Sequence, residues 1–268
     1  MNNLNDKQLI KELLKGGESI VGPFARIQDP AAIEILGYGG FDFGIIDLEH
    51  GPASIHQVEN LIRAAKLVGL SPIIRIRENS QTMIQRALDA GAIGVQIPQI
   101  NNAEMAREAV RSAKFHPMGE RGVCRFTRSA QYSHIPKEVY FDKANDESLV
   151  ILQVEGLEGV RNIDKIVEVD GFDVLFIGPY DLSQALGIPG QVEDPKVIET
   201  MESITKKARE RGIAVGAFAD NLNSVKRFID MDLQYLSFGI DTGIFYESTK
   251  KVVSDVKNLI EDRKDLRV

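Results

Sequence analysis

Residues 149–183, LVILQVEGLEGVRNIDKIVEVDGFDVLFIGPYDLS, contain the pattern that decides the fold of this chain. Two apolar runs rich in strand-forming residues, Leu149–Val154 and Val174–Ile177, enclose residues 157–167. Apolar residues in the enclosed segment recur every three or four positions, which is typical of a helix. A helix between two fully apolar strands is the pattern of a βαβ unit in a parallel sheet.

Polar groups follow both apolar runs at the point where each strand ends. Gln153 and Glu155 end the first run, and Gly178-Pro179-Tyr180-Asp181 follows the second. Ligands bind at the carboxyl ends of the strands in such sheets, so we expect Glu155 and Asp181 to face each other across neighbouring strand ends. Two carboxylates with no Cys or His beside them suit Mg²⁺ or Mn²⁺, which keep waters and take further ligands from the substrate.

The same alternation of strand and helix extends over most of the chain and predicts an α/β fold, a single (β/α)8 TIM barrel spanning residues 1–268. A short amphipathic helix over residues 5–15 precedes the barrel, and a long helix over about residues 245–262 follows it. Residues 115–148 interrupt the rhythm, and a segment of that length is usually functional. The eight predicted strands are 20–27, 43–47, 72–76, 94–100, 149–154, 174–177, 214–219 and 235–240.

The composition excludes several classes of partner. The net charge of −7 and the pI near 5.3 argue against nucleic acid. No run approaches the ~18 apolar residues of a membrane span. The single cysteine, Cys124, excludes an internal disulfide and fits a reducing compartment, so we expect a soluble, cytoplasmic protein.

Two strand-end residues are the best candidates for proton and charge chemistry. His50 lies in a Glu-His-Gly-Pro turn, and the ordinary pKa of histidine near neutrality suits a general acid or base. Arg75 ends another strand, where its guanidinium can hold a developing oxyanion. Taken singly, each of these residues is equally well explained as a hydrogen-bonded polar residue at a strand end without a catalytic role. Their occurrence together at several strand ends favours a functional site. The full set of such groups is Asp47, Glu49, His50, Arg75, Gln153, Glu155, Gly178, Tyr180 and Asp181.

Nucleotide cofactors and Schiff-base chemistry are not supported. No GxGxxG motif follows a strand, and no Walker-type loop occurs. The loops at residues 218–221 and 239–243, where a phosphate cradle would form in a barrel, are acidic. No predicted strand end presents a lysine, which a class I aldolase needs.

Seven motifs together carry a resemblance to a known family. They are Gly40-Phe41-Asp42, Ile46-Asp47-Leu48-Glu49-His50-Gly51-Pro52, Arg75, Leu88-Asp89-Ala90-Gly91, Gly119-Glu120-Arg121-Gly122-Val123, Gln153-Val154-Glu155 and Gly178-Pro179-Tyr180-Asp181-Leu182-Ser183. With these motifs the chain resembles, over about residues 24–241, the HpcH/HpaI aldolases. These are class II pyruvate aldolases on a phosphoenolpyruvate-binding type of TIM barrel, such as the 4-hydroxy-2-oxoheptanedioate and 2-keto-3-deoxy-L-rhamnonate aldolases.

The resemblance implies a role for each matching position. Glu155 and Asp181 match the ligands of Mg²⁺ or Mn²⁺ (other divalent cations such as Co²⁺ fit as well), and Gln153 lies beside the pyruvyl unit. Arg75 matches the arginine that binds the keto oxygen and stabilises the enolate. The remaining matches are His50 as the catalytic histidine, Asp89 as its carboxylate partner, contributed from a neighbouring subunit, and the backbone around Gly178, Tyr180 and Asp181 for the substrate carboxylate.

The resemblance also implies an assembly and a reaction. Members of the family commonly form hexamers, trimers of dimers that exchange their last helix, here about residues 245–262. The expected reaction is metal-dependent, reversible cleavage of a 4-hydroxy-2-oxo acid to pyruvate and an aldehyde.

One loop departs from the family pattern and keeps other functions open. Residues 121–129, RGVCRFTRS, replace a small, Ala-rich stretch, and Arg125 and Arg128 there favour an acidic acceptor. The alternative is a citrate-synthase-like condensation of oxaloacetate with acetyl-CoA in siderophore biosynthesis, since a similar barrel serves that reaction. A non-catalytic binding barrel is the third reading, and the joint presence of His50, Arg75 and two acidic ligands argues against it.

Overall fold

The fold is a closed barrel of eight parallel strands in sequence order, seen in a computed structural model that describes residues 9–265. Each strand pairs with its neighbours in the sequence, and β1 closes the barrel against β8. The expected α/β barrel is therefore confirmed. The strands are β1 (Ile20–Ala25), β2 (Phe43–Asp47), β3 (Ser71–Arg75), β4 (Gly94–Ile97), β5 (Leu149–Val154), β6 (Val174–Ile177), β7 (Ala214–Ala219) and β8 (Tyr235–Ile240).

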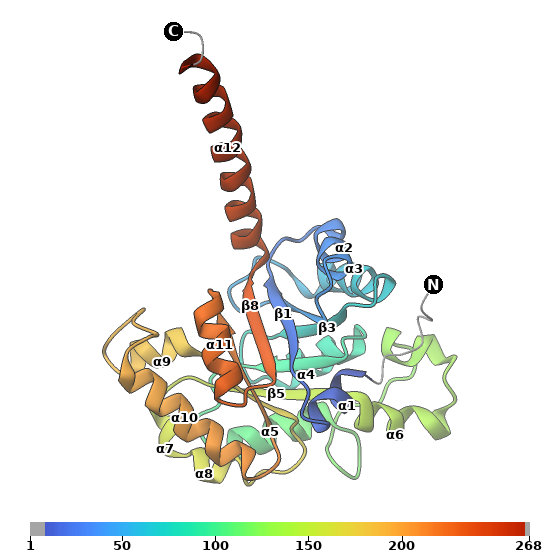
Figure 1. Cartoon of the computed structure of the whole chain (residues 1–268). Helices are drawn as coiled ribbons and strands as arrows, with labels where there is room; N and C mark the ends of the chain where they lie inside the picture. Colours follow the sequence, from blue (N-terminus) through green and yellow to red (C-terminus); the bar gives the residue numbers. More distant parts are fainter. Residues whose placement is uncertain (1–8, 266–268) are drawn as a thin grey trace.

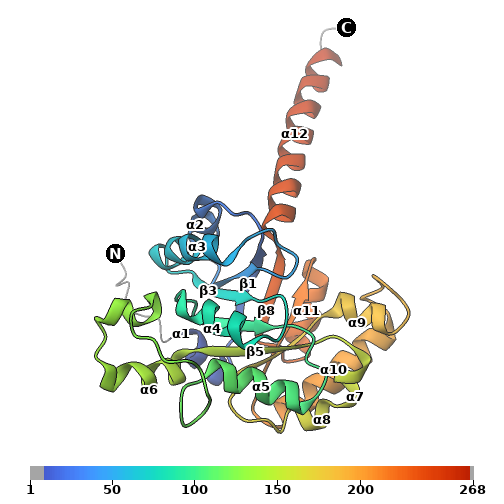
Figure 2. The ribbon, with the colours of Figure 1, turned by 180° about the vertical axis from the view of Figure 1, so that it is seen from behind.

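Helices surround the barrel. The last helix of the chain is the exception, because it projects away from the body (Figures 1 and 2). The helices are α1 (Leu9–Lys15), α2 (Pro30–Tyr38), α3 (Ile55–Leu67), α4 (Gln81–Asp89), α5 (Ala103–Ala113), the 3-10 helix η1 (Arg128–Ser133), α6 (Lys137–Glu147), α7 (Leu157–Arg161), α8 (Ile163–Ile166), α9 (Pro179–Ala185), α10 (Pro195–Arg209), α11 (Leu222–Asp230) and α12 (Asp241–Asp265). Residues 5–8 of the predicted first helix lie outside the described residues. No helix within residues 9–265 has the length and apolarity to cross a membrane.

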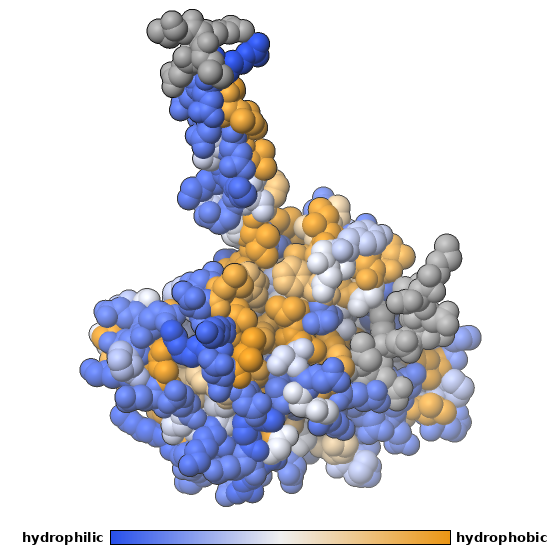
Figure 3. Space-filling view, viewed as in Figure 1, coloured by the Kyte–Doolittle hydropathy of each residue, from blue (hydrophilic) through white to orange (hydrophobic). Residues whose placement is uncertain are grey.

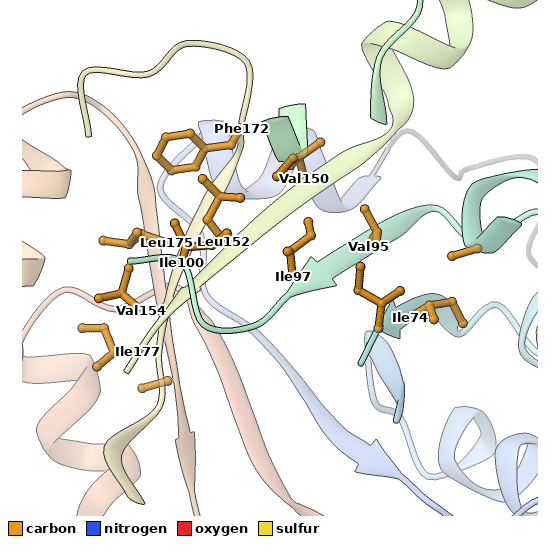
Figure 4. Close-up of a cluster of buried hydrophobic side chains, with 14 of the residues drawn as sticks. Ile74, Val95, Ile97, Ile100, Val150, Leu152, Val154, Phe172, Leu175 and Ile177 are labelled. Carbon is orange, nitrogen blue, oxygen red and sulfur yellow. The ribbon is translucent and has the colours of Figure 1, made fainter. Parts of the chain in front are cut away.

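The strand side chains alternate between two apolar cores. One set points outward and packs under the helices, as the labelled residues on β3 to β6 do in Figure 4. The other set fills the barrel, and includes Phe24, Phe43, Phe176 and Tyr235. Because side chains alternate along a strand, the polar residues two positions beyond an interior residue point to the same interior, toward the mouth of the barrel.

Several elements differ in extent from the predicted ones. The helical segment 157–167 is divided into α7 and α8 at Asn162, whose side-chain amide donates to the Asn101 carbonyl 2.9 Å away. Strand β1 ends at Ala25, because the next two backbone N–H groups donate to the carboxylate of Asp241. Strand β4 ends at Ile97, because Pro98 has no N–H to continue the ladder.

The interrupting segment 115–148 is part loop and part helix, as expected. It contains η1 and α6 and has a small core of its own, formed by Phe115, Ala130 and Tyr140. The buried Asn145 ties its two ends together, since its side chain accepts from the N–H of Phe115 at 2.6 Å and donates to the carbonyl of Phe115 at 3.0 Å. The segment is therefore a folded insertion between α5 and β5.

Candidate active site

Arg75 is held at the mouth of the barrel by a two-point ion pair. Its Nε donates to Oδ1 of Asp47 and its Nη2 donates to Oδ2, both at 2.9 Å. The third nitrogen, Nη1, lies 3.1 Å from Oε2 of Glu49, and the guanidinium lies over the ring of Phe24, 4.4 Å from its centroid. Three strand ends thus fix the plane of one guanidinium, which suits recognition of a planar or developing anion.

The turn that carries His50 is built on the same carboxylate. Oδ1 of Asp47 accepts from the backbone N–H groups of Glu49 at 3.0 Å and His50 at 3.2 Å. The guanidinium of Arg26 donates to the carbonyl of His50. Gly51 is required there, because a Cβ would lie 2.0 Å from the carbonyl oxygen of Asp47. The imidazole of His50 is exposed on this constrained turn, within reach of an incoming ligand.

Glu155 is a buried carboxylate with both oxygens oriented by donors. Gln153 Nε2 donates to Oε2 at 2.5 Å, and the backbone N–H of Gln99 donates to Oε1 at 3.0 Å. Gln99 is aimed by its left-handed backbone, φ 58°, which is uncommon for a residue other than glycine. Behind Gln153, the fully buried Gln96 donates to Oε1 of Gln153 at 2.6 Å.

Burial raises the pKa of the Glu155 carboxyl to about 7, and the charges of Asp181 and Glu49 add to the rise, while the Gln153 and Gln99 hydrogen bonds oppose it. Burial likewise raises the pKa of Glu49, against the opposing effect of Arg75. Three carboxylates are therefore close enough to disfavour one another's charge at the mouth. A cation is the group that would relieve this repulsion.

A divalent cation fits the residues at this position. Gly178 leaves the space beside the carboxylate open, since a Cβ there would lie 2.7 Å from Oε2 of Glu155. Glu155 is buried and Asp181 is exposed at the next strand end, so both can offer oxygen ligands. Within residues 9–265 no cluster of three or more His, Cys, Asp or Glu could hold a metal, so such a cation would take its other ligands from substrate and water.

Tyr180 lies beside the mouth rather than inside it. Its hydroxyl donates to the carboxylate of Asp220 at the end of β7, and its ring packs on Phe218, with centroids 6.0 Å apart. That hydrogen bond, together with burial, raises the pKa of Tyr180 to about 12. The phenol therefore stays protonated and forms part of the rim.

Asp89 is not near His50 within one chain. It is the last residue of α4, at the barrel end where β4 begins, and its Oδ1 lies 2.6 Å from Nη2 of Arg121. The loop with Arg125 and Arg128 belongs to the same end, since Arg128 Nη1 lies 3.5 Å from the carbonyl of Ala90. Within one chain this loop lies away from the mouth, so the predicted contribution of Arg125 and Arg128 to an acceptor pocket would need another copy of the chain.

Four residues of the site were missed from the sequence. Phe24 lies on β1 and Arg26 lies just after it, and no residue of the predicted strand 20–27 was named as a candidate for the site. Gln96 and Gln99 flank Pro98, and an amide inside a four-residue apolar strand was the one signal that could have indicated Gln96. Arg77, two residues after Arg75, donates from its Nε to the carbonyl of Leu48 at 2.9 Å.

The family model "HpcH/HpaI aldolase/citrate lyase" matches residues 21–248. A 4-hydroxy-2-oxo-heptane-1,7-dioate aldolase of Escherichia coli is 32% identical over 245 residues, which cover 91% of this chain and 93% of that protein.

Solved structures agree with this relationship. An HpcH/HpaI aldolase from Desulfitobacterium hafniense DCB-2 is 33% identical with a TM-score of 0.88, covering 92% of this chain and 96% of that one. The citrate synthase SbnG is 29% identical with a TM-score of 0.85, covering 94% and 98%. By the extent and level of these matches, the chain belongs to the HpcH/HpaI aldolase/citrate lyase family and is an enzyme of the aldolase, or lyase, type.

Proposed function

We propose that this enzyme is a divalent-metal-dependent aldolase that reversibly cleaves a 4-hydroxy-2-oxo acid into pyruvate and an aldehyde. The observation that carries the proposal is the convergence at one mouth of a rigidly held guanidinium, Arg75, and two carboxylates, Glu155 and Asp181. The guanidinium and a cation held by the two carboxylates would form a pair of electrophiles. Such a pair suits a 2-oxo acid, which has a carboxylate and a keto oxygen side by side.

Glu155 and Asp181 would hold Mg²⁺ or Mn²⁺, with Co²⁺ as a further candidate. When bound, the cation would supply Lewis-acid polarisation of the keto oxygen. We assign the substrate carboxylate to the turn from Gly178 to Asp181 and the pyruvyl unit to the neighbourhood of Gln153.

The protein residues would divide the proton and charge steps between them. His50 accepts the proton of the C4 hydroxyl as the C3–C4 bond breaks, and the electron pair of that bond passes into the pyruvate enolate. Arg75 stabilises the enolate oxygen, because Asp47 uses two of its five N–H groups and Glu49 faces a third, which leaves two for the substrate. Protonation at C3 then yields pyruvate. No lysine takes part as a Schiff base.

The test is pyruvate release from a panel of neutral and acidic 4-hydroxy-2-oxo acids, with Mg²⁺ or Mn²⁺ and with EDTA. We expect release that needs the cation and is lost in Glu155→Ala and Arg75→Ala. Arg77→Ala is the matched control, because Arg77 is exposed and its one side-chain hydrogen bond among the described residues goes to the backbone carbonyl of Leu48. Pyruvate release that persists in EDTA, or trapping of pyruvate on a lysine by borohydride, would contradict the proposal.

A second candidate function is the condensation of oxaloacetate with acetyl-CoA. The likeness to the citrate synthase SbnG over 94% of the chain favours keeping it. Two results together would favour this condensation over the aldolase reaction. They are release of free CoA thiol in the presence of both compounds and no pyruvate release from the panel of 4-hydroxy-2-oxo acids.

We further propose that the whole chain is one barrel domain that assembles with copies of itself, exchanging α12. The helix projects from the barrel with an apolar stripe, and an apolar area lies at its base near β8 and α11 (Figure 3). An exposed stripe of this kind marks an interaction surface. Its residues are Phe245, Tyr246, Val252, Val253, Val256, Leu259 and Ile260.

Assembly would also give Asp89 its expected role, because a carboxylate at the far end of one barrel can reach His50 only in another copy. We expect a homo-oligomer, a hexamer in the family's form, in the cytoplasm, where the exposed thiol of Cys124 stays reduced. Light scattering on the wild type and on Val256→Asp tests the assembly. A monomeric wild type would contradict it.

A further inference from the structure

A chain of three buried polar side chains runs from the candidate metal ligand into the barrel. Gln96 Nε2 donates to Gln153 Oε1 at 2.6 Å, and Gln153 Nε2 donates to Glu155 Oε2 at 2.5 Å. Gln96 is fully buried, while Gln153 is 2% and Glu155 6% exposed. Gln96 is paired in register with Arg75 on β3, and its side chain donates to Gln153 and has no hydrogen bond to Glu155 among the described residues.

The direction of this chain is determined by its carboxylate end. An ionised carboxylate can only accept, so Gln153 must turn its NH₂ group toward Glu155. The Gln153 carbonyl then points the other way, and a donor must lie there. Gln96 supplies that donor.

Gln96 supplies this donor at a cost in folding free energy. Its Oε1 is buried and has no hydrogen-bond partner among the described residues. An unpaired buried acceptor is destabilising, and an apolar side chain at this position would avoid the cost. Interior positions on the neighbouring strands, such as Ile73 and Ile151, are apolar. The stability of the barrel alone therefore does not account for an amide here.

We propose that Gln96 is a positioning residue for the catalytic site: it locks the amide of Gln153 in the orientation that donates to Glu155 and so holds that carboxylate ready to bind the cation. The proposal rests on the proposed function for its catalytic meaning. Without Gln96, the Gln153 amide can rotate and present its carbonyl to Glu155, which removes one of the two donors that orient the carboxylate.

Two substitutions separate positioning from simple filling of the barrel. Gln96→Met keeps the length of the side chain and removes the donor. Gln96→Glu keeps the shape, and because burial favours the neutral carboxyl, it keeps an O–H that can donate to Gln153. Ser237→Ala is the matched control, because Ser237 is also a fully buried polar residue without a partner for its hydroxyl among the described residues.

The first experiment measures Mn²⁺ binding by calorimetry without substrate. Loss of a partner behind a metal ligand typically weakens binding roughly 10- to 100-fold. We expect Gln96→Met to lie in that range, whereas Gln96→Glu, which keeps a donor, and Ser237→Ala should bind as the wild type does. A folded Gln96→Met protein with unchanged Mn²⁺ affinity would overturn the proposal.

The second experiment needs neither metal nor activity. Melting temperatures in EDTA are compared for wild type, Gln96→Met, Glu155→Met and the double variant. Because Gln96 and Glu155 share no hydrogen bond with each other among the described residues, a role in filling the barrel predicts additive shifts in melting temperature, whereas coupling through Gln153 predicts shifts that do not add. Additive shifts would overturn the positioning role. A wild type that binds no Mn²⁺ would instead refute the proposed function, and the melting cycle would still decide on Gln96.

Discussion

Asp47 and Arg75 make a bidentate ion pair across β2 and β3, with both N–O distances 2.9 Å and Asp47 only 2% exposed. The same Asp47 also accepts from the backbone N–H groups that lead into His50. One carboxylate therefore sets both the plane of the guanidinium and the path of the turn that carries the imidazole. Its position on β2, paired in register with Arg75, makes this arrangement part of the barrel itself.

Asp47→Asn should strongly reduce turnover. An amide offers one acceptor where the carboxylate offers two, and its NH₂ group would oppose the guanidinium. We expect kcat for pyruvate release to fall on the order of 10²-fold or more, as for the loss of an oxyanion donor. Unfolding in urea should also show a loss of stability, up to about 3–5 kcal/mol, from breaking a buried pair. Wild-type turnover in this variant would show that Arg75 does not depend on Asp47.

Gly178→Ala should weaken cation binding without unfolding the barrel. The added Cβ would lie 2.7 Å from Oε2 and 3.1 Å from Cβ of Glu155, so the carboxylate must move. Overpacking of this kind costs about 1–3 kcal/mol. Mn²⁺ titration should show a clear loss of affinity. Gly243→Ala is the control, since a Cβ there meets no atom within 4 Å, and equal effects of both changes would contradict the argument.

Gln99→Gly should keep the site and slightly stabilise the protein. The backbone of Gln99 is left-handed, with φ 58°, and its N–H rather than its exposed side chain binds Glu155. The left-handed conformation costs an ordinary residue about 1–2 kcal/mol, which glycine avoids and its chain entropy partly offsets. Thermal unfolding in EDTA should show an equal or higher midpoint. A marked drop in Mn²⁺ affinity would instead assign a role to the side chain.

Lys114 should make stability depend on pH above 8. Its Nζ is buried and donates to the carbonyls of Asn145 and Ser148, both at 2.7 Å, and burial lowers the pKa from 10.5 to about 8. Between these values the unfolded chain binds more protons, so the contribution of Lys114 to the unfolding free energy rises with pH. Below about pH 8 the free-energy penalty for burying the charged Lys114 is fully present, and by about pH 10.5 this penalty is lost.

Urea unfolding of wild type and Lys114→Met from pH 7 to 10.5 would measure this contribution. Over this pH range the unfolding free energy of the wild type should rise, relative to that of the variant, by up to about 3 kcal/mol, at ~1.4 kcal/mol per pKa unit. Lys143→Met, which removes a half-exposed lysine from α6, should leave the pH profile unchanged. A constant gap between wild type and Lys114→Met would mean that Lys114 keeps its ordinary pKa.

Local pattern was sufficient to predict the barrel. Fully apolar runs such as Leu149–Val154 and Val174–Ile177 need cover on both faces, and only helices between parallel strands give it. The strand ends were also predictable, because each apolar run stops at a polar residue such as Asp47, Arg75 or Glu155. Their meeting at one mouth follows from parallel strands alone.

What only the tertiary structure decided is which of these groups bind one another. Asp47 and Arg75, and Gln96, Gln153 and Glu155, lie on strands whose relative register no single strand determines. The left-handed turn at Gln99 depends on closure of the barrel around Glu155. The separation of Asp89 from His50 depends on the direction of α4, which returns to the opposite end. Sequence determines which side chains face inward, since alternation is local; register and closure determine their partners, since those arise between distant segments.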